Sequence, residues 1–431
     1  MAGGKGTRLA EITKDIIPKP MVPLLGKPLL ERQVECLKAN GVTDIIMVVG
    51  HLGEVIREYF GDGSKWGVNI RYFVEEEPMG TAGALPQMGD MLEEEFILLF
   101  GDLLLDVDFG RMAAFHNEKQ ALATLFVHPN SHPYDSDLIQ TDDENRLIGF
   151  DSKHNDRTGY WYANCVNAGL YIMDRKILEF ISKQNKVDLE KEVLAPLCAQ
   201  GAAIYAYASP EYVKDVGTVE RIRVAELELE SGYVAGRNLK HKQRAIFLDR
   251  DGTVNVNKGL VYAPEQLELE ECAVEAIRLI NQSGYLAILA TNQPVVARGL
   301  CSIEEVEEIH RKLETLLGKE GAYLDGIEFC PHHPDKGFPE ENPAYKVPCL
   351  CRKPGTAMLE RCVERFNIDL ASSWVVGDTT VDIQTGVNAG CKTALVMTGE
   401  AGEDKKFDVK ADIEAANLLE AVKKILNEDF S

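Results

Sequence analysis

Positive charge is scarce in this chain. Its 431 residues include 46 Lys and Arg against 69 Asp and Glu, which gives a formal net charge of -23. The field around such a protein repels phosphodiester backbones, so we expect no nucleic-acid partner. Small anionic substrates can bind only where local cations, metals or backbone N–H groups overcome that field.

The sequence also lacks long apolar runs, a signal-peptide pattern, internal repeats and low-complexity tracts. No apolar stretch is long enough to span a bilayer, which argues against a membrane partner. The ten cysteines do not follow the spacing of a small secreted domain held by disulfides. We therefore expect a cytoplasmic protein.

Short apolar runs alternate with helical patterns in two glycine-punctuated stretches. One helical pattern covers Leu29–Asn40 and stops at Gly41. This alternation predicts an α/β fold with parallel sheets and helices on both faces, arranged as two Rossmann-like doubly wound domains. The predicted strands include Ile45–Val49, Phe96–Phe100, Ala245–Leu248, Leu286–Ala290 and Trp374–Val376.

The boundary between the two domains is predicted near 231–243, after a long helical pattern at Val219–Glu230. The boundary segment contains glycines and a short basic cluster, which is typical of a connection rather than a packed element. We assign 1–235 to the first domain, 236–243 to a linker and 244–431 to the second domain.

Two carboxylates follow directly on the predicted strand Ala245–Leu248. The sequence Asp249-Arg250-Asp251 places them at the carboxyl edge of a parallel sheet, where α/β proteins build sites. Carboxylates this close repel one another unless a cation joins them, and Mg²⁺ does so while neutralising a phosphate. Asp249 can then attack phosphorus and Asp251 can protonate the leaving oxygen. The motif alone is also compatible with a turn that carries solvated acids.

Three further polar elements follow in the same half of the chain. Thr291-Asn292-Gln293 comes after the second predicted strand and can hold phosphate oxygens. Lys353 supplies a point charge for a phosphoryl group. Asp378 comes after the third strand and offers another carboxylate to a metal. Each of these elements alone can also be an ordinary polar loop segment. Their common position at strand ends favours a phosphoryl-transfer site.

These four motifs resemble those of the haloacid dehalogenase superfamily of phosphatases, and the resemblance covers 244–431. It implies Asp249 as the nucleophile and Asp251 as the general acid/base. It implies Mg²⁺ held by Asp249, Asp251 and Asp378, with Asp382 supporting the metal site from outside. The substrate contacts it implies are Thr291, Asn292, Arg298, Arg352 and Lys353.

Two close pairs of metal-binding side chains flank the proline-rich loop 331–348. They are Cys330 with His332 and Cys349 with Cys351. Three thiolates and one imidazole suit tetrahedral Zn²⁺, and the loop has little apolar content with which to pack itself.

His333 is a competing ligand, but the matching one-residue spacing of the two pairs favours His332. Four protein ligands leave no open coordination position, so we expect a structural zinc. Its expected role is to place Arg352 and Lys353, which follow Cys351 directly.

The zinc loop narrows the resemblance to the branch that contains D-glycero-D-manno-heptose 1,7-bisphosphate 7-phosphatase and histidinol-phosphatase. The short interval between Asp251 and Thr291 leaves no room for a large cap domain. One departure is Pro294–Gly299, which reads Pro-Val-Val-Ala-Arg-Gly where heptose phosphatases often have Ser-Gly-Ile before Ala-Arg-Gly. The fine specificity therefore stays open.

The first half opens with a glycine-rich loop that includes Gly3, Gly4 and Gly6. Backbone N–H groups in such a loop can approach a triphosphate closely, and Arg8 adds positive charge. A second glycine-rich turn, Glu77–Ala84, can receive a base and a sugar.

Charged residues in this half add to the pattern. Lys19 lies between two prolines, which present it rigidly. Asp102 ends an apolar strand and Asp215 lies far along the chain. Two such carboxylates can share a Mg²⁺ that bridges nucleotide and sugar phosphates.

The combined pattern resembles the sugar-1-phosphate nucleotidyltransferases, which have a GT-A-like fold. The resemblance implies in-line attack of a sugar 1-phosphate on the α-phosphorus of a nucleoside triphosphate, with release of pyrophosphate. It implies that Arg8 and Lys19 stabilise charge and that Asp102 and Asp215 hold Mg²⁺. The substrate contacts it implies are Gly3, Gly4, Gly6, Thr7, Gly80, Thr81, Asn167, Gly169, Glu190 and Lys191.

The two resemblances together suggest consecutive reactions. A heptose bisphosphate phosphatase yields a heptose 1-phosphate, which a sugar-1-phosphate nucleotidyltransferase can consume. The related ADP-heptose route uses a nucleotidyltransferase with a His-x-Gly-His motif, which is absent here. The remaining route, by resemblance, makes GDP-D-glycero-α-D-manno-heptose.

Two alternatives remain open at this point. The phosphatase can act on histidinol phosphate or another small phosphomonoester, or the first half can be a catalytically weak binding module. No side chain identifies the nucleotide base.

The position of residue 1 leads to a further expectation. In the nucleotidyltransferase family, a strand in the middle of the sheet runs directly into the glycine-rich loop, and Met1 lies inside the position where that strand ends. Loss of a central strand would expose apolar surface and leave the phosphate loop held at one end. We therefore expect that the natural protein starts several residues upstream, with Met1 inside an Ile-, Val- and Leu-rich strand. The alternative is that another segment fills the gap.

Overall fold

The computed structural model describes residues 13, 16–183, 186–337 and 340–428. The chain forms two compact units. The first consists of Met1–His128, Ile139–Asp151 and Asn167–Asn238, and the second of Pro129–Leu138, Ser152–Val166 and Leu239–Ser431. The final passage of the chain from one unit to the other falls between Asn238 and Leu239, inside the segment predicted as a linker.

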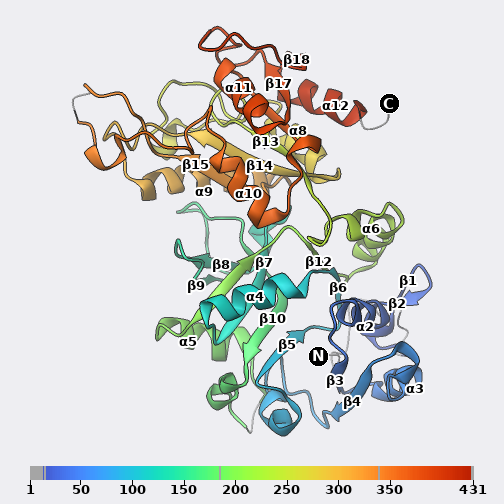
Figure 1. Ribbon diagram of the computed structural model, residues 1–431. Coiled ribbons are helices and arrows are strands. Elements are labelled where there is room, and N and C mark those ends of the chain that lie inside the picture. The colour runs from blue at the N-terminus through green and yellow to red at the C-terminus, as the bar shows by residue number, and fades with distance from the viewer. Residues whose placement is uncertain (1–12, 14–15, 184–185, 338–339, 429–431) are drawn as a thin grey trace. The chain divides into compact units, whose positions relative to one another are not determined.

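The N-terminal strands and helices occupy the predicted α/β stretch (Figure 1). The strands are β1 (Pro23–Leu24), β2 (Lys27–Pro28), β3 (Asp44–Val49), β4 (Asn69–Val74), β5 (Glu95–Leu99), β6 (Leu103–Asp106), β7 (Ala123–His128), β8 (Leu138–Thr141), β9 (Leu147–Asp151), β10 (Val166–Asp174), β11 (Ile204–Ala208) and β12 (Tyr212–Asp215). The α-helices are α2 (Leu29–Ala39), α3 (Gly53–Phe60), α4 (Phe109–Lys119), α5 (Ala195–Ala199), α6 (Val219–Glu230) and α7 (Tyr233–Gly236). The strands predicted at Ile45–Val49 and Phe96–Phe100 correspond to β3 and β5, and the helix predicted at Leu29–Asn40 corresponds to α2.

Strand direction in this part of the chain departs from the prediction. The larger sheet has the order β11-β7-β10-β8-β9, and β5 also pairs with β10. Strands β7 and β11 run parallel, as do β3 and β4, but β10 is antiparallel to both β5 and β8. The prediction of parallel sheets therefore holds for these two pairs and was wrong for β10, because apolar alternation looks the same in either strand direction.

Two strands of the first unit each have an edge that no described strand pairs with. Strand β3 pairs with β4 on one side, and β5 pairs with β10 on one side. A cavity of about 520 Å³ lies beside both strands and is lined by side chains from α2, β3 and β5, including Leu30, Met47 and Leu98. The space beside these two strands is lined largely by apolar side chains.

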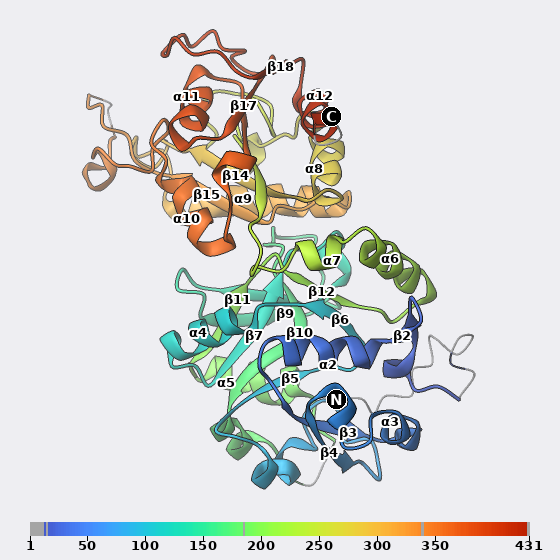
Figure 2. The same cartoon turned by 45° about the vertical axis from the view of Figure 1, so that its right-hand side comes forward.

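The C-terminal strands form one parallel sheet (Figure 2). The strands are β13 (Arg244–Leu248), β14 (Tyr285–Asn292), β15 (Gly326–Cys330), β16 (Trp374–Gly377), β17 (Lys392–Val396) and β18 (Ile413–Ala415). The α-helices are α8 (Ala273–Asn281), α9 (Ile303–Lys319), α10 (Ala357–Phe366), α11 (Thr380–Ala389) and α12 (Leu418–Glu428).

The order of this sheet is β15-β14-β13-β16-β17-β18, and all its neighbours are parallel. The chain starts in the middle at β13, winds outward through β14 and β15, and then winds the other way from β16. The reversal puts a topological switch point at the carboxyl end of β13, where open α/β sheets bind their ligands.

Alternate residues along β13 enter two different cores. Ile246 and Leu248 pack with apolar residues of α8, α9 and α12. Ala245 and Phe247 pack on the other face with residues of α10. A strand covered on both faces must be apolar at every position, which explains the uninterrupted run Ala245–Leu248.

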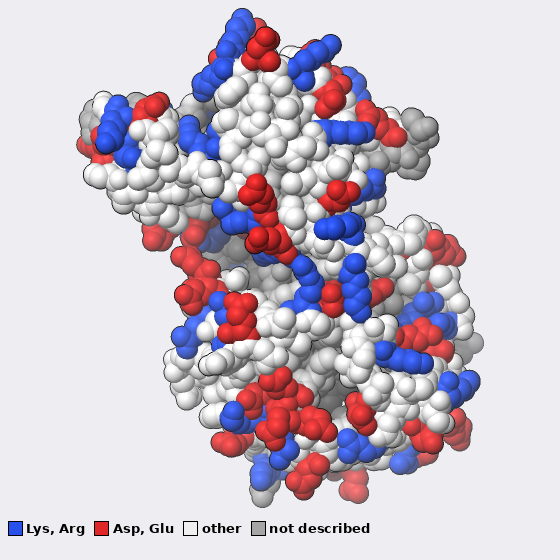
Figure 3. Space-filling view, viewed as in Figure 1, with Lys and Arg blue, Asp and Glu red and all other residues white. Residues whose placement is uncertain are grey.

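Acidic side chains gather over the lower part of the first unit on the face drawn in Figure 3. This agrees with the excess of Asp and Glu in the composition. Among the described residues, no helix combines the length and the hydrophobicity needed to cross a bilayer.

Candidate functional sites

Three predicted motifs of the second unit stand at the carboxyl edge of its sheet. Asp249 follows β13 directly, Thr291 lies near the end of β14, and Asp378 follows β16. Because β14 and β16 are the two neighbours of β13, these motifs meet at the switch point. The predicted strand ends therefore lie at one edge of the sheet, and the role of these residues as a site stays a prediction.

Lys353 joins two carboxylates at this point. Its Nζ atom lies 2.6 Å from Oδ1 of Asp249 and also contacts Oδ1 of Asp382. Asp249, Asp378 and Asp382 each offer a carboxylate oxygen, and these atoms all lie within 4.8 Å of one another. Burial alone would lower the pKa of Lys353, but Asp249 and Asp382 outweigh it and raise that pKa.

Burial and mutual repulsion raise the pKa values of two of these acids, Asp249 and Asp378. Burial, together with Asp382 and Asp251, outweighs Lys353 and raises the pKa of Asp249 to about 6. Burial and the charges of Asp249 and Asp382 raise the pKa of Asp378 to about 8. The Oδ1 atom of Asp378 is buried without a hydrogen-bond partner. A group of acids with one unsatisfied buried oxygen fits a divalent cation with oxygen ligands.

The loop that follows β17 closes over Asp378, a contact that no sequence pattern predicted. The backbone N–H of Glu400 donates to Oδ2 of Asp378 at 2.7 Å. A Cβ atom on Gly252 would lie 2.3 Å from that oxygen, and one on Gly399 would lie 2.0 Å from it. Both glycines have positive φ. Only residues without side chains therefore leave room for this carboxylate.

The carboxylate of Asp251 is held by donors instead of lying in the acidic group. The guanidinium of Arg250 donates to both of its oxygens, with the shortest distance 2.9 Å. Asn255 donates to Oδ1 at 3.0 Å and Gln293 donates to Oδ2 at 2.8 Å. Sequence reasoning singled out Asp251 but missed Arg250 and Asn255 as its partners. Asp251 as a metal ligand stays a prediction, and Asp382 is the third acid of the group.

The predicted phosphate-binding residues of β14 are tied to Lys353. Asn292 accepts the backbone N–H of Lys353 at 3.0 Å and donates to its carbonyl at 3.3 Å. The buried hydroxyl of Thr291 accepts from Gln293 at 3.0 Å. Asn292 thus fixes the backbone from which Lys353 reaches Asp249.

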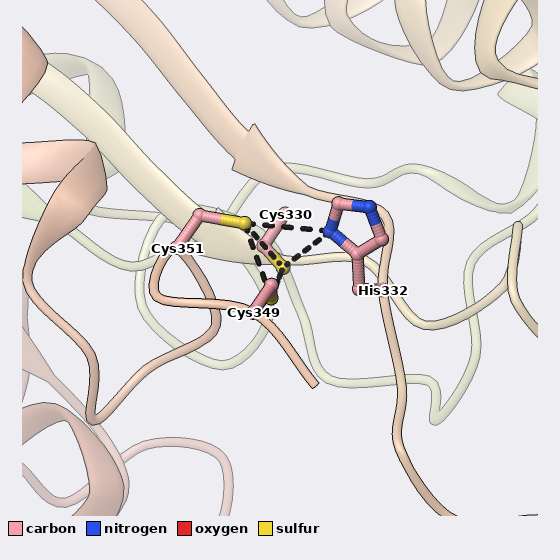
Figure 4. Close-up of side chains that lie close together, drawn as sticks. All are labelled: Cys330, His332, Cys349 and Cys351. Atoms are coloured by element: carbon pink, nitrogen blue, oxygen red, sulfur yellow. Dashed lines mark hydrogen bonds between the residues drawn. The ribbon is translucent and has the colours of Figure 1, made fainter. Parts of the chain in front are cut away.

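The four predicted zinc ligands lie together (Figure 4). The Sγ atom of Cys351 is 3.2 Å from the Sγ atoms of Cys330 and Cys349, and 3.4 Å from Nδ1 of His332. Tetrahedral bonds of about 2.3 Å would separate two sulfur atoms by about 3.8 Å. The side chains are thus close enough for a single metal ion, and Zn²⁺ is the metal that this donor set favours.

The other histidine of this loop does not belong to the group. Nδ1 of His333 instead accepts the backbone N–H of Asp335 at 3.2 Å. Arg352 is attached to the group at two points, since its backbone N–H donates to Sγ of Cys349 and its Nη1 donates to the carbonyl of His332. The cluster therefore holds the segment that leads to Lys353.

Three predicted residues of the first unit converge on one place. Lys19 forms an ion pair with Asp102. Asp215 pairs in register with Leu103, the neighbour of Asp102, across the antiparallel strands β6 and β12. A Cβ atom on Gly217 would lie 3.0 Å from Oδ1 of Asp215 and 3.3 Å from Nζ of Lys19. The two carboxylates, distant in sequence, thus lie beside one cation.

Asp215 also has a partner that the sequence did not indicate. Arg221, in the first turn of α6, forms an ion pair with its carboxylate. Lys19 and Arg221 together offset the charges of the two acids.

The predicted sugar-phosphate residues form a hydrogen-bonded group around a buried tyrosine. Nδ2 of Asn167 donates to Oε1 of Glu190 and to the hydroxyl of Tyr171, both at 2.9 Å. That hydroxyl donates to Glu190 at 3.0 Å. Gly169 donates its N–H to Asn167, and with φ of 75° it packs where a Cβ would lie 2.8 Å from Phe100. Tyr171 was missed because a buried aromatic in a strand looks like core.

The second glycine-rich turn meets the segment that carries Glu190. Gly80 pairs with Val187, and a Cβ on Gly80 would lie 2.4 Å from the carbonyl oxygen of Val187. The hydroxyl of Thr81 accepts the N–H of Leu189 at 2.7 Å. The side chain of Lys191, which follows Glu190 in the sequence, is exposed to solvent. The predicted Gly3, Gly4, Gly6, Thr7 and Arg8 lie outside the described residues.

Comparison with known proteins identifies both halves. A family model described as nucleotidyl transferase matches residues 1–232, and one described as HAD-hydrolase-like matches residues 350–421. This chain belongs to the nucleotidyl transferase family and carries, in its C-terminal part, a domain of the HAD-like hydrolases.

Three curated relatives match one half each. A mannose-1-phosphate guanylyltransferase of Mycobacterium tuberculosis is 33% identical over 51% of this chain, and the chain spans only 60% of that protein's length. A D-glycero-alpha-D-manno-heptose 1-phosphate guanylyltransferase of Campylobacter jejuni is 34% identical over 44% of this chain and 81% of its own length. A D-glycero-beta-D-manno-heptose-1,7-bisphosphate 7-phosphatase of Haemophilus ducreyi is 36% identical over 42% of this chain and 97% of its own length.

Proposed function

We propose that this chain catalyses two consecutive steps in the synthesis of GDP-D-glycero-α-D-manno-heptose. The second unit removes the 7-phosphate of heptose 1,7-bisphosphate, and the first unit transfers GMP from GTP to the heptose 1-phosphate that results. The observation that carries the proposal is the contact of Lys353 with Asp249 and Asp382 at the sheet switch point. The heptose-phosphate names of two relatives support the substrate.

In the phosphatase reaction, Asp249 attacks the phosphorus atom while the bond between phosphorus and the sugar oxygen breaks. Asp251 gives its proton to the leaving oxygen, which departs as a hydroxyl. Water then attacks the aspartyl-phosphate and loses a proton to Asp251, which releases phosphate and restores Asp249. Lys353 and Thr291 hold the phosphoryl oxygens throughout, with Asn292, Arg298 and Arg352 contacting substrate.

In the nucleotidyltransferase reaction, a phosphate oxygen of the heptose 1-phosphate attacks the α-phosphorus of GTP. The bond from the α-phosphorus to the bridging oxygen breaks, and pyrophosphate leaves. Lys19 and Arg8 offset the charge that develops. The group of Asn167, Gly169, Glu190 and Lys191 holds the sugar phosphate, while the glycine-rich turns hold the nucleotide.

Two kinds of metal fit the donor sets of this chain. Asp249, Asp251 and Asp378 would hold Mg²⁺ in the phosphatase, and Asp102 and Asp215 would hold Mg²⁺ in the transferase. When bound, Mg²⁺ neutralises phosphate charge and orients the transferred group. The Cys330, His332, Cys349 and Cys351 group would hold a structural Zn²⁺ that keeps Arg352 and Lys353 in place.

We place the functional domains at 1–235 and 244–431, joined by the linker 236–243, in a cytoplasmic enzyme. Because the first domain would take its substrate from the second, both must use the same anomer of heptose 1-phosphate. The two relatives differ in this respect, since the phosphatase name specifies the β-anomer and the guanylyltransferase name the α-anomer. We assign the α-anomer because the guanylyl transfer comes last and determines which anomer of heptose 1-phosphate can be consumed.

The test is turnover of both anomers of heptose 1,7-bisphosphate with GTP, ATP, UTP and dTTP in turn, following phosphate and pyrophosphate release. We expect phosphate release with the α-anomer, followed by pyrophosphate release with GTP alone. Faster release from histidinol phosphate would favour the alternative phosphatase. Phosphate release without pyrophosphate under any condition would favour a binding role for the first half.

A further inference from the structure

A fully buried arginine lies directly behind the proposed general acid/base. The side chain of Arg250 is 0% exposed. Its Nη2 lies 2.9 Å and 3.1 Å from the two oxygens of Asp251, and its Nε lies 3.3 Å from one of them. Its Nη1 lies 3.4 Å from Nε2 of His310, in the middle of α9. The guanidinium thus connects a carboxylate of the site with a ring outside it.

His310 is arranged to accept this hydrogen bond. The residue is 4% exposed, and its ring lies edge-on to Phe329 with centroids 5.3 Å apart. Burial, with Arg250 and Arg311, lowers the pKa of His310 well below its usual value. A neutral ring that accepts at Nε2 carries its proton on Nδ1. His310 therefore accepts from Arg250 without competing for Asp251.

The direction of the Asp251 carboxylate is fixed by this arrangement. Arg250, Asn255 and Gln293 all donate to it. Arg250 is next to Asp251 in sequence, and without a second anchor its long side chain could turn elsewhere. His310 supplies that anchor from a different element. The planar fork of arginine can meet both groups at once, which a lysine cannot do.

We propose that Arg250 and His310 are positioning residues that aim the Asp251 carboxyl at the leaving-group oxygen. This rests on the proposed phosphatase function, in which Asp251 supplies the proton. A general acid must be held within hydrogen-bond reach of the atom it protonates. The pair acts through Asp251 alone, so its contribution depends on how much help the leaving group needs.

Leaving groups provide the test. Departure of an alkoxide from a sugar phosphate needs protonation, whereas departure of p-nitrophenolate does not. For each substrate, kcat/KM reports the step that forms the aspartyl-phosphate, because later hydrolysis does not enter it. We expect His310→Leu to lower kcat/KM for glucose 6-phosphate or heptose bisphosphate by about tenfold to a hundredfold more than for p-nitrophenyl phosphate.

Matched variants separate positioning from loss of structure. His310→Gln keeps a hydrogen-bond acceptor at this position. It should restore most of the wild-type ratio of kcat/KM for the sugar phosphate to kcat/KM for p-nitrophenyl phosphate. Leu313→Ala removes a buried side chain of the same helix that packs in the apolar core, and it should lower melting temperature while leaving the ratio unchanged. Arg250→Lys keeps the positive charge but not the planar fork, so kcat/KM should again fall more for the sugar phosphate than for p-nitrophenyl phosphate. This variant provides the test if His310→Leu does not fold.

An unchanged ratio in both His310→Leu and Arg250→Lys would overturn the proposal. An equal fall for both substrates in those variants would also overturn it, because that is the result of a structural role. Failure of the phosphatase assignment can be told apart from failure of this proposal. If Asp249 is not the nucleophile, Asp249→Asn will keep its activity toward both substrates.

Discussion

Lys353 and Asp249 form a buried ion pair, with Nζ 2.6 Å from Oδ1, between residues that are 104 positions apart in the sequence. The lysine reaches the acid from the loop that carries the cysteine cluster. The same Nζ contacts Asp382, so the cation is shared by two acids. This contact links the proposed nucleophile, the loop of the cysteine cluster and the sheet edge.

Replacing the nucleophile should separate the two activities. Asp249→Asn removes the attacking oxygen but keeps a side chain of the same shape, and Lys353 retains Asp382 as a partner. We expect phosphate release below about 1% of wild type with little change in the transferase rate. Parallel assays of phosphate and pyrophosphate check this. Residual phosphate release of more than a few per cent would refute the assignment of Asp249.

Zinc content and one ligand variant test the cysteine cluster. Purified protein should contain about one zinc per chain, on the ligand count of a structural site. Cys349→Ser should lower the free energy of unfolding of the second unit by roughly 2–5 kcal/mol and reduce phosphatase activity, because Arg352 and Lys353 lose their support. Cys272→Ser lies outside the cluster and is the control. Elemental analysis that finds no zinc in active protein would contradict the prediction.

A pair of glycine variants tests the cradle of Asp378. Gly399 and Gly390 both have positive φ, but a Cβ on Gly390 meets nothing within 4 Å, while one on Gly399 lies 2.0 Å from Oδ2 of Asp378. Both alanine variants bear the cost of a left-handed backbone, about 1 kcal/mol. Only Gly399→Ala must move the carboxylate, so we expect its phosphatase kcat/KM to fall at least about tenfold below that of Gly390→Ala. Equal rates in the two variants would show that the cradle has no role.

Stability should respond to Mg²⁺ more at high pH than at low pH. The folded-state pKa is about 8 for Asp378 and about 6 for Asp249, above the value of a free carboxyl. The metal-free folded chain therefore binds more protons than the unfolded chain between about pH 4 and pH 8, and its free energy of unfolding falls as pH rises through that window. Mg²⁺ binds the deprotonated acids and offsets this loss.

Thermal melts with and without Mg²⁺ at pH 5 and pH 8 provide the measurement. We expect a clear rise in melting temperature at pH 8 and little at pH 5. Asp378→Asn removes one charge from the group, so it should melt higher than wild type without Mg²⁺ at pH 8 and respond less to the ion. A Mg²⁺ shift that is the same at both pH values, or in the variant, would argue against this site.

An apolar strand added ahead of residue 1 should fill the cavity beside β3 and β5. About six Ile- and Val-rich residues match the length of those strands and the apolar lining of the cavity. We expect the extended chain to melt at a higher temperature and to transfer nucleotide faster, with an unchanged phosphatase rate. An extension of equal length made of Ser and Asn is the control. Equal transferase rates and melting temperatures in the two extended chains would show the idea to be wrong.

The sequence by itself determined the elements and the order of the motifs. The apolar runs at Ala245–Leu248 and Trp374–Val376 correspond to β13 and β16, and Asp249 and Asp378 follow them. Such inferences succeed because a buried strand and the polar residue at its end are adjacent in sequence. Parallel strands then bring their ends to one edge, which makes the site predictable from local patterns.

Only the tertiary structure decided which distant side chains meet. The contact of Arg250 with His310, the fit of Gly399 against Asp378 and the antiparallel course of β10 leave no local signal in the sequence. Each depends on two segments that the fold brings together, and a residue's own neighbours do not reveal its distant partner. A buried arginine in an acidic motif or a glycine in a loop acquires its role from the chain that packs against it.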